Sequence, residues 1–310
     1  MPFLNRLKEP ALWWYNRHTE ETTMLIDGGL VLEGGGTRCL FSAGILDRLI
    51  ENKIYFKHVY SVSAGAYVAI SYISKQKGWS EAALLDTVKT NKLFSWWHFF
   101  TRGSVINIKL MFDKIPNEML PLDYEEFFGS GQDLTMCLTD LKTGDPVYIN
   151  KYEDKKHLMD MCCASNSFPV ISRTRFVDGR PMTDGGMADA IPIRKAVSDG
   201  VEKSLIILTQ QSRYRKELKT SKLITTRYFW HKNFVRTIRE RPYKYNSDLD
   251  FVEELVYQKQ AIAFYPEISL PKLITRDPKR LRELYRHGYE MGKTVVEQTK
   301  EFFGITGEIC

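Results

Sequence analysis

Three consecutive glycines, Gly34-Gly35-Gly36, separate an apolar stretch at residues 28–33 from a helix-like stretch at residues 38–51. The first stretch favours a buried strand, and the second carries apolar residues at helical spacing. The same order recurs at residues 57–62 and 64–75, which predict a second strand leading into a second helix. Strands that alternate with helices pair in parallel, because each helix carries the chain back across the sheet. The sequence therefore predicts an α/β fold with a mainly parallel central sheet.

The rest of the chain adds elements to this fold before its composition changes. Strands are expected at residues 133–139, 145–150 and 204–209, a short strand ending at Asp184, and a helix at residues 155–165. After about residue 210 the sequence becomes basic, aromatic and helical. We therefore expect an N-terminal segment (1–27), an α/β domain (28–210) and a basic, mainly helical C-terminal extension (211–310).

Composition limits the class of protein. Apolar residues make up 43% of the 310 residues and charged residues 26%, as in ordinary globular proteins. The five cysteines are odd in number and form no CxxC pair, so neither a disulfide framework nor a metal site is expected. No run of about 18 apolar residues is present, and the N-terminus lacks the apolar core of a signal peptide. We expect a cytoplasmic protein that touches membranes only from their surface.

The glycine loop is suited to binding an anion, because free backbone N–H groups and the helix dipole point the same way at a helix N-terminus. A phosphate loop would need a Gly-Lys-Ser/Thr ending, which is missing. A dinucleotide loop would need a third glycine where Cys39 stands. A transient oxyanion and a plain tight turn remain as alternatives.

Ser63 lies in a second motif. Ser61-Val62-Ser63-Ala64-Gly65 is similar to the nucleophile elbow G-x-S-x-G, with serine in place of the first glycine. In that elbow a strained strand-to-helix turn projects the serine Oγ from the sheet. Ser63 follows a predicted strand and opens a predicted helix, as this geometry requires. The alternative is an ordinary surface turn.

A serine nucleophile needs a base, and none of the six histidines occupies a recognisable position for that role. Asp184 is the better candidate, because Gly185 and Gly186 after it permit a close turn at a strand end. Two rival aspartates suit the role less well. Asp178 has the context of a hairpin turn, and Asp189 that of a polar residue entering the next segment.

Together these segments resemble the patatin-like phospholipases over residues 28–210. That family has a G-G-G-x-R-G loop, a G-x-S-x-G elbow, an A-S-x-A-x-P segment and a D-G-G or D-G-A aspartate. The corresponding segments here are Gly34–Cys39, Ser61–Gly65, Ala164–Pro169 and Asp184–Gly186. Cys39 and Ser61 depart from the pattern, but both are small.

The resemblance implies a three-layer sandwich and a Ser63–Asp184 dyad that hydrolyses lipid carboxylic esters through an acyl-enzyme, without a cofactor. It also implies an oxyanion hole formed by the loop residues Gly34, Gly35, Gly36, Thr37 and Arg38. Arg38 would face a phosphate head group or stabilise its own loop. The alternative function is a catalytically weak lipid- or anion-binding protein that keeps the fold.

Two segments suggest contact with a membrane surface. Residues 93–100 hold five aromatic side chains, which suits a membrane interface, a pocket mouth or a buried core. Residues 213–244 carry eleven basic residues opposed only by Glu217 and Glu240. We expect this stretch to meet anionic lipids, the alternative being a solvated helix face. Nucleic acid is not an expected partner, because no recognised binding motif accompanies the charge.

Overall fold

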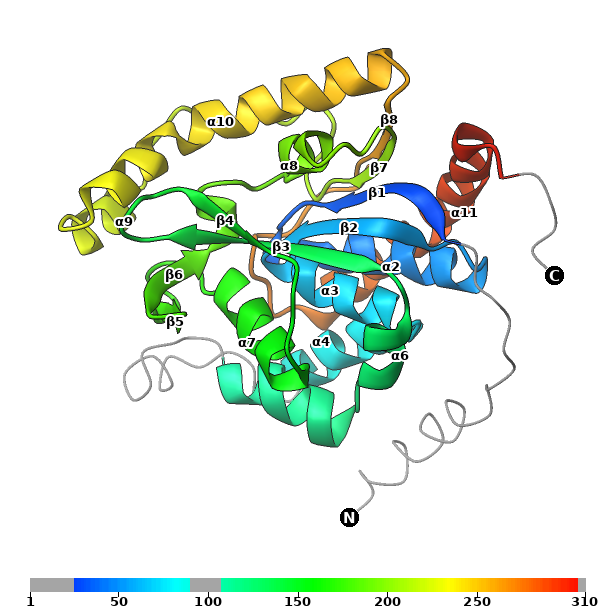
Figure 1. Ribbon diagram of the computed structural model, residues 1–310, viewed down its shortest axis with the longest axis horizontal. Helices are drawn as coiled ribbons and strands as arrows, with labels where there is room; N and C mark the ends of the chain where they lie inside the picture. The colour runs from blue at the N-terminus through cyan, green and yellow to red at the C-terminus, as the bar shows by residue number, and fades with distance from the viewer. Residues whose placement is uncertain (1–24, 90–106, 306–310) are drawn as a thin grey trace.

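The two apolar stretches beside the glycine loop and the elbow form neighbouring strands of one sheet (Figure 1). The computed structural model describes residues 25–89 and 107–305. Within those residues the sheet has eight strands: β1 (Ile26–Leu32), β2 (Phe56–Val62), β3 (Asp133–Asp140), β4 (Pro146–Ile149), β5 (Arg175–Val177), β6 (Arg180–Asp184), β7 (Ser204–Ile207) and β8 (Ala261–Phe264). Their order is β5-β6-β3-β2-β1-β7-β8, with β4 also paired to β3.

Helices cover both faces of the sheet, which confirms the three-layer α/β fold (Figure 1). They are η1 (Gly36–Arg38), α2 (Cys39–Glu51), α3 (Ala64–Ile73), α4 (Trp79–Lys89), η2 (Leu110–Met119), α6 (Tyr124–Gly129), α7 (Lys155–Ser165), η3 (Gly185–Met187), α8 (Ile193–Ser198), α9 (Lys222–Arg227), α10 (Lys232–Tyr257) and α11 (Pro278–Phe303). In β1, Leu30 and Leu32 pack with α2, α3 and α11, whereas Val31 packs with α8 and α10. This alternation is the two-residue period of a strand buried on both faces.

The central strands are parallel, as predicted, because β1 pairs in parallel with β2 and β7, and β2 with β3. The exceptions are β4 and β6, which run antiparallel to β3. Along β3, the last residue of β2, Val62, pairs with Cys137, and the last residue of β6, Asp184, pairs with Leu138. The strand β4 pairs with the part of β3 that spans both of these positions, so β2 and β6 lie together on the other side of β3. There the two strands meet end to end. This register brings the residue after Val62 next to Asp184.

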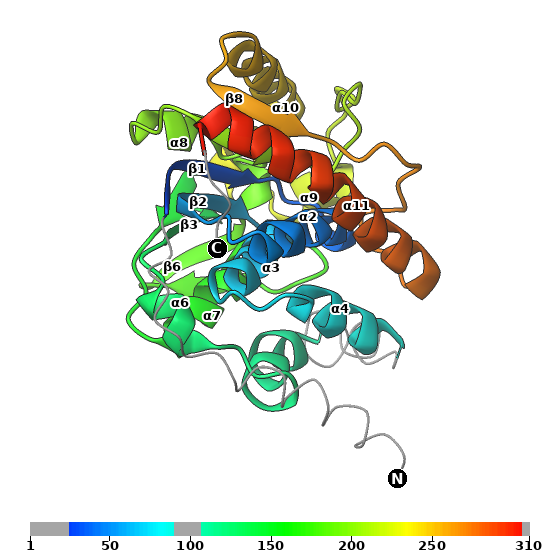
Figure 2. The same cartoon turned by 90° about the vertical axis from the view of Figure 1, so that its right-hand side faces the viewer.

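Residues after 210 contribute to every layer. The strand β8, which the sequence did not predict, pairs in parallel with β7 beyond the strand expected to be last. The helix α10 covers one face of the sheet, and α11 lies along α2 on the other (Figure 2). The Asp277 carboxylate caps α11, and Gly304 ends it with a left-handed backbone, at φ 68°.

Candidate active site

Ser63 lies in a strained turn between β2 and α3. Its backbone angles, φ 53° and ψ −131°, belong to a region that residues other than glycine rarely adopt. Two neighbours hold the turn. The Ser63 amide donates to Oγ of Ser165 at 2.8 Å, and Nδ2 of Asn166 donates to the Ser63 carbonyl at 2.8 Å. The strain and its two fixing contacts are the geometry of a nucleophile elbow.

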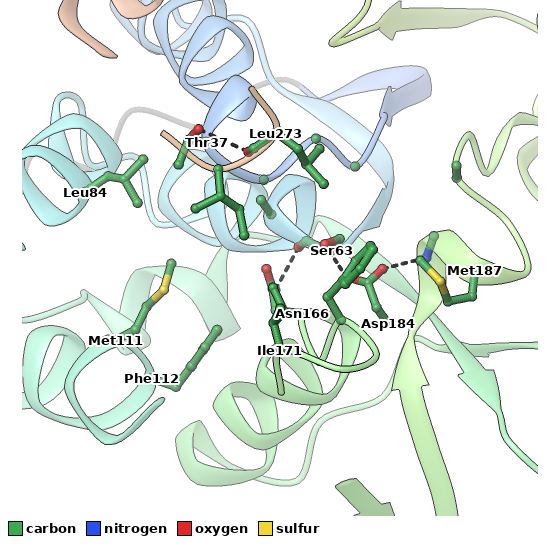
Figure 3. Close-up of a pocket in the computed structure, with 18 of the residues that line it drawn as sticks. Thr37, Ser63, Leu84, Met111, Phe112, Asn166, Ile171, Asp184, Met187 and Leu273 are labelled. Atoms are coloured by element: carbon green, nitrogen blue, oxygen red, sulfur yellow. Dashed lines mark hydrogen bonds between the residues drawn. The ribbon is translucent and has the colours of Figure 1, made fainter. Parts of the chain in front are cut away.

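Asp184 accepts a hydrogen bond from the Ser63 hydroxyl, with 2.7 Å between Oγ and Oδ2 (Figure 3). Its other oxygen, Oδ1, accepts from the Gly186 amide at 2.8 Å. Gly185 permits this turn, because a Cβ atom there would lie 2.1 Å from the Cys137 carbonyl oxygen. Burial raises the pKa of Asp184 to about 6, against the opposing effects of both hydrogen bonds and of Arg241. A carboxylate with such a pKa is still ionised at neutral pH and can accept the serine proton.

The side chains of Ser63 and Asp184 line a pocket, and none of the four histidines within the described residues is among the residues that line it. His58 lies on β2 beside Asp27 and Asp133. His287 stacks on Phe41, and its Nε2 accepts from the Glu267 amide. His18 and His98 lie outside the described residues. The geometry thus offers Ser63 a carboxylate partner.

The five predicted oxyanion residues differ in what their amides already bind. The Thr37 amide donates to the Leu273 carbonyl at 3.0 Å, and the Arg38 amide donates to Gly35 at 3.0 Å. Gly34 donates to the Ala190 carbonyl at 3.3 Å. Within the described residues, the amides of Gly35 and Gly36 have no carbonyl acceptor. Gly36 needs its glycine, because its φ is 54° and a Cβ atom would lie 2.5 Å from the Leu273 oxygen.

A further amide, that of Ala64, was not predicted as part of the oxyanion hole. It is the first residue of α3, where N–H groups have no partner within the helix, and it lines the same pocket as Gly35 and Gly36. The residue after a serine nucleophile commonly supplies one oxyanion donor. That rule could have identified Ala64 from the sequence.

The two departures from the family pattern sit in tight places. Cys39 is buried, and its Sγ lies 3.6 Å from the Glu33 carbonyl oxygen, while the Gly35 amide also interacts with this sulfur. Ser61 is fully buried, and its hydroxyl has no hydrogen-bond partner among the described residues. Gly65 packs where a Cβ atom would lie 3.0 Å from the Leu32 and Glu33 oxygens. The elbow therefore keeps its form with serine at its first position.

The pocket around Ser63 is mostly apolar (Figure 3). Its walls come from α4, η2, the segment after α7, the segment around η3 and the segment after β8: Leu84, Met111, Phe112, Phe168, Ile171, Met187, Ala190, Leu273 and Ile274. Such a lining suits the hydrocarbon part of an ester substrate. The aromatic segment 93–100, for which a pocket mouth was one of the expected locations, lies outside the described part of the chain.

Arg241, which the sequence placed in a lipid-facing basic stretch, instead lines the pocket. It reaches in from α10, and its Nε donates to the Gly186 carbonyl at 2.6 Å. Its charge lowers the pKa of Asp184, which burial raises. Nothing in the local sequence separates Arg241 from its exposed neighbours, because its partner lies 55 residues away.

The remaining candidates have structural partners. Nε of Arg38 donates to the Pro271 carbonyl at 2.9 Å, which fixes its loop. Asp178 has the left-handed backbone of a hairpin turn, at φ 50°. The buried Asp189 accepts from the Tyr148 hydroxyl at 2.6 Å. No cluster of three or more metal-ligating side chains occurs in residues 25–89 and 107–305, and no helix there is long and apolar enough to cross a bilayer.

A family model described as patatin-like phospholipase matches residues 30–197, just over half of the chain, and one described as a domain of unknown function matches residues 231–304. The chain is 28% identical over 188 residues to the uncharacterized protein YjjU of Escherichia coli K12, covering 59% of this chain and 52% of that protein. The match thus spans about half the length of this relative. Among solved structures, VipD from Legionella pneumophila is similar with a TM-score of 0.47 and 14% identity, over 89% of this chain and 68% of that one.

Proposed function

Because this chain belongs to the patatin-like phospholipase family, we propose that it hydrolyses carboxylic esters of lipids with Ser63 as nucleophile and Asp184 as base. The observation that carries the proposal is the 2.7 Å hydrogen bond between Ser63 and Asp184 at the floor of an apolar pocket. A serine hydroxyl becomes an effective nucleophile only when an adjacent group takes its proton. The surrounding apolar walls would hold the acyl chain while the ester carbonyl rests on Ser63.

The reaction would proceed in two halves. Oγ of Ser63 attacks the ester carbonyl, and its proton passes to Oδ2 of Asp184. The amides of Gly36 and Ala64, with that of Gly35, donate to the oxyanion, and such a donor is worth roughly 3–4 kcal/mol in the transition state. The alcohol leaves with the proton from Asp184. Asp184 then takes a proton from water, which attacks the acyl-enzyme, and it returns that proton to Oγ of Ser63 as the bond to the acyl group breaks and the fatty acid is released.

A fluorophosphonate probe followed by intact-mass measurement tests this proposal, because the probe labels activated serines. We expect one label on the native protein, none on Ser63→Ala, and full labelling of the control Ser198→Ala, which changes an exposed serine on α8. Ser63→Ala should also lower p-nitrophenyl ester hydrolysis by roughly a thousandfold or more. Hydrolysis by Ser63→Ala above about a tenth of the native rate would reject Ser63 as nucleophile, because a true nucleophile contributes a much larger factor.

The second candidate function is a catalytically weak protein that binds lipids or anions. The contact between the Cys39 sulfur and the Gly35 amide favours it, because it gives one prospective oxyanion donor another partner. Lipid binding by a native protein that takes no fluorophosphonate label would establish this function in place of hydrolysis.

Contact with anionic membranes is the third part of the proposal, and exposed side chains between residues 213 and 244 support it. Six exposed basic residues between 213 and 244 have no ion-pair partner among the described residues: Arg213, Lys222, Arg227, Lys232, Arg236 and Arg239. Beside them, Leu223, Phe229 and Trp230 are 65%, 54% and 75% exposed. Exposed apolar side chains that alternate along the chain with unpaired cations suit the interface of an anionic bilayer.

This surface connects directly to the pocket. The inner side of α9 and the turn after it, at Ile224 and Tyr228, pack in one cluster with Met187, which lines the pocket. Docking through α9 would therefore hold the pocket wall close to the lipid layer. Arg241 and Lys244 are not part of the docking surface, since one lines the pocket and the other pairs with Asp248 at 2.7 Å.

A further inference from the structure

Three cations from distant parts of the chain lie near one another, and one of them, Arg241, lines the pocket beside Asp184. Arg38 follows the glycine loop, Lys216 lies in the segment after β7, and Arg241 lies on α10. The charges of Arg38 and Arg241 both act on Lys216, and both act on Tyr214. The Lys216 ammonium lies 4.5 Å from the centre of the Tyr245 ring, next to Tyr214. The three side chains therefore form one group, which we call the cation cluster.

Carboxylates near the cation cluster are occupied by other donors. Glu33 is buried and accepts from the Tyr245 hydroxyl and the Thr209 amide, both at 2.6 Å. Asp184 accepts from Ser63 and Gly186. Within the described residues, none of Arg38, Lys216 and Arg241 forms an ion pair. The charges of Glu33 and Asp184 act on Arg241, and that of Glu33 also acts on Lys216, so two carboxylates face three cations and the site keeps an excess of positive charge.

This arrangement is unfavourable for the empty protein. Cations removed from water are costly unless an anion accompanies them, and three that lie close together also repel one another. Burial and the neighbouring Arg241 lower the pKa of Lys216 to about 8, which reflects both effects. A bound anion would relieve the repulsion and replace the lost hydration.

We propose that the cation cluster binds a phosphate group of the substrate, so that the enzyme acts on lipid esters that carry a phosphate monoester close to the scissile bond. The inference rests on the proposed hydrolysis at Ser63. Only Nε of Arg241 is engaged, with the Gly186 carbonyl, and within the described residues its two Nη groups have no hydrogen-bond partner. Paired guanidinium N–H groups match two phosphate oxygens, and three cations favour a doubly charged group over a carboxylate.

The position of the cluster fits a small phospholipid. Arg241 contacts Gly186, the same residue whose amide holds Asp184, so the phosphate would bind only a short distance from the ester carbonyl. In lysophosphatidic acid, a short glycerol chain separates the ester from the phosphate. The acyl chain would extend along the apolar walls formed by Met111, Phe112 and Ile171. An ester without a phosphate would leave the excess positive charge of the cluster uncompensated.

Binding to the Ser63→Ala protein tests this inference without requiring hydrolysis. Titration calorimetry would compare lysophosphatidic acid with the monoacylglycerol of the same chain, each in neutral detergent micelles. We expect Ser63→Ala to bind the phosphate lipid at least about tenfold more tightly, as hydrogen bonds between charged groups imply. Adding Arg241→Gln should remove this preference, whereas adding Arg282→Gln, the same change at an exposed residue of α11 outside the docking surface, should leave it intact.

Several results would overturn the inference. Equal affinity of Ser63→Ala for the two lipids would refute it, as would a preference that survives Arg241→Gln. Inorganic phosphate that binds as tightly as the lipid would refute a lipid site in favour of a free-phosphate site. Lys216→Gln provides a second variant should Arg241→Gln fold poorly, and it should reduce the preference severalfold.

A kinetic comparison separates phosphate binding from mere positioning of Asp184. Arg241→Gln should lower kcat/KM for lysophosphatidic acid at least about tenfold more than for the monoacylglycerol, with partial rescue by Arg241→Lys. Equal losses on both lipids would reduce Arg241 to a positioning residue and overturn the inference. If the native protein hydrolyses neither lipid but Ser63→Ala still shows the Arg241-dependent preference, the phosphate site stands and the proposed hydrolysis fails.

Discussion

Replacing Asp184 with asparagine should abolish ester hydrolysis and at the same time stabilise the protein at neutral pH. Burial raises the pKa of Asp184 to about 6 from its ordinary value of 3.8. A carboxyl whose pKa is raised on folding stabilises the protein relatively at low pH, and this contribution is lost as the pH rises through the folded-state pKa. Above about pH 6 the ionised carboxylate therefore costs roughly 3 kcal/mol, since one pKa unit corresponds to about 1.36 kcal/mol.

Asparagine keeps the shape of the side chain without the charge. Its Oδ1 can still accept from the Gly186 amide, and its Nδ2 can donate to Oγ of Ser63. We therefore expect Asp184→Asn to raise the free energy of unfolding by up to about 3 kcal/mol at pH 7. At pH 5 the gain should fall to roughly half of that value, because native Asp184 is then mostly protonated.

Urea unfolding of both proteins between pH 5 and pH 8 measures this difference directly. A matched control is Asp189→Asn, which changes another carboxylate whose pKa burial raises to about 6 but which contacts Tyr148 and Lys244 and not Ser63. Asp189→Asn should keep esterase activity, and Asp184→Asn should lose it as fully as Ser63→Ala. The native enzyme should lose activity below about pH 6, as Asp184 becomes protonated.

Three results would contradict these expectations. An Asp184→Asn protein that is less stable than the native one at pH 7 would mean that the ionised carboxylate is not destabilising. A stability gain that does not change between pH 5 and pH 8 would mean that its origin is not the titration of Asp184. Loss of activity on replacement of a histidine, without unfolding, would contradict the role of Asp184 as the base.

Two further predictions concern the membrane surface and the elbow. In liposome flotation, Arg236→Gln with Arg239→Gln should weaken binding to anionic vesicles at low salt only, whereas Trp230→Ala should weaken it at both low and high salt, because salt screens charge but not hydrophobic insertion. Equal binding to neutral and anionic vesicles at low salt would contradict the electrostatic part. Ser61→Ala should raise the free energy of unfolding by about 1 kcal/mol, since it removes a buried hydroxyl without a partner. Ser165→Ala should lower the free energy of unfolding, because the Ser165 hydroxyl donates to the Cys137 carbonyl and accepts from the Ser63 amide. Urea unfolding measures both changes. A loss of stability in Ser61→Ala as well as in Ser165→Ala would contradict the hydrogen-bonding difference between the two serines.

The parts of the fold that the sequence predicted are those fixed by local pattern. The strand–glycine–helix and strand–serine–helix units, the short strand ending at Asp184 and the helix at residues 155–165 all form close to their expected bounds. Each depends on apolar periodicity and turn residues within a few positions of one another. The pairing of Ser63 with Asp184 could also be predicted, because Ser63 directly follows one strand, Asp184 ends another, and both belong to motifs of one family.

What the sequence did not predict depends on contacts between distant segments. The strand β8 is four residues long and finds its partner β7 across more than fifty residues. The segment Ala164–Pro169 was recognised, but that Ser165 and Asn166 hold the Ser63 turn follows only from the structure. Arg241 shared its charge pattern with exposed neighbours on α10. The sequence of a basic stretch shows how many cations it contains, but the direction in which each side chain points depends on tertiary packing.

The same long-range contacts tie the C-terminal extension to the chemistry. The Leu273 carbonyl accepts from the Thr37 amide and side chain, and Pro271 accepts from Arg38, so the segment after β8 fixes the shape of the glycine loop. On the other side of the dyad, Arg241 holds the carbonyl of Gly186, whose amide orients Asp184. Residues 28–210 alone would contain Ser63, Asp184 and the glycines, but not the groups that hold the glycine loop and the Asp184 turn in place. Since oxyanion stabilisation depends on donors held in place before the reaction, the extension is part of the catalytic apparatus in this proposal, and its helix α10 carries both the phosphate-binding Arg241 and the cations that would face a membrane.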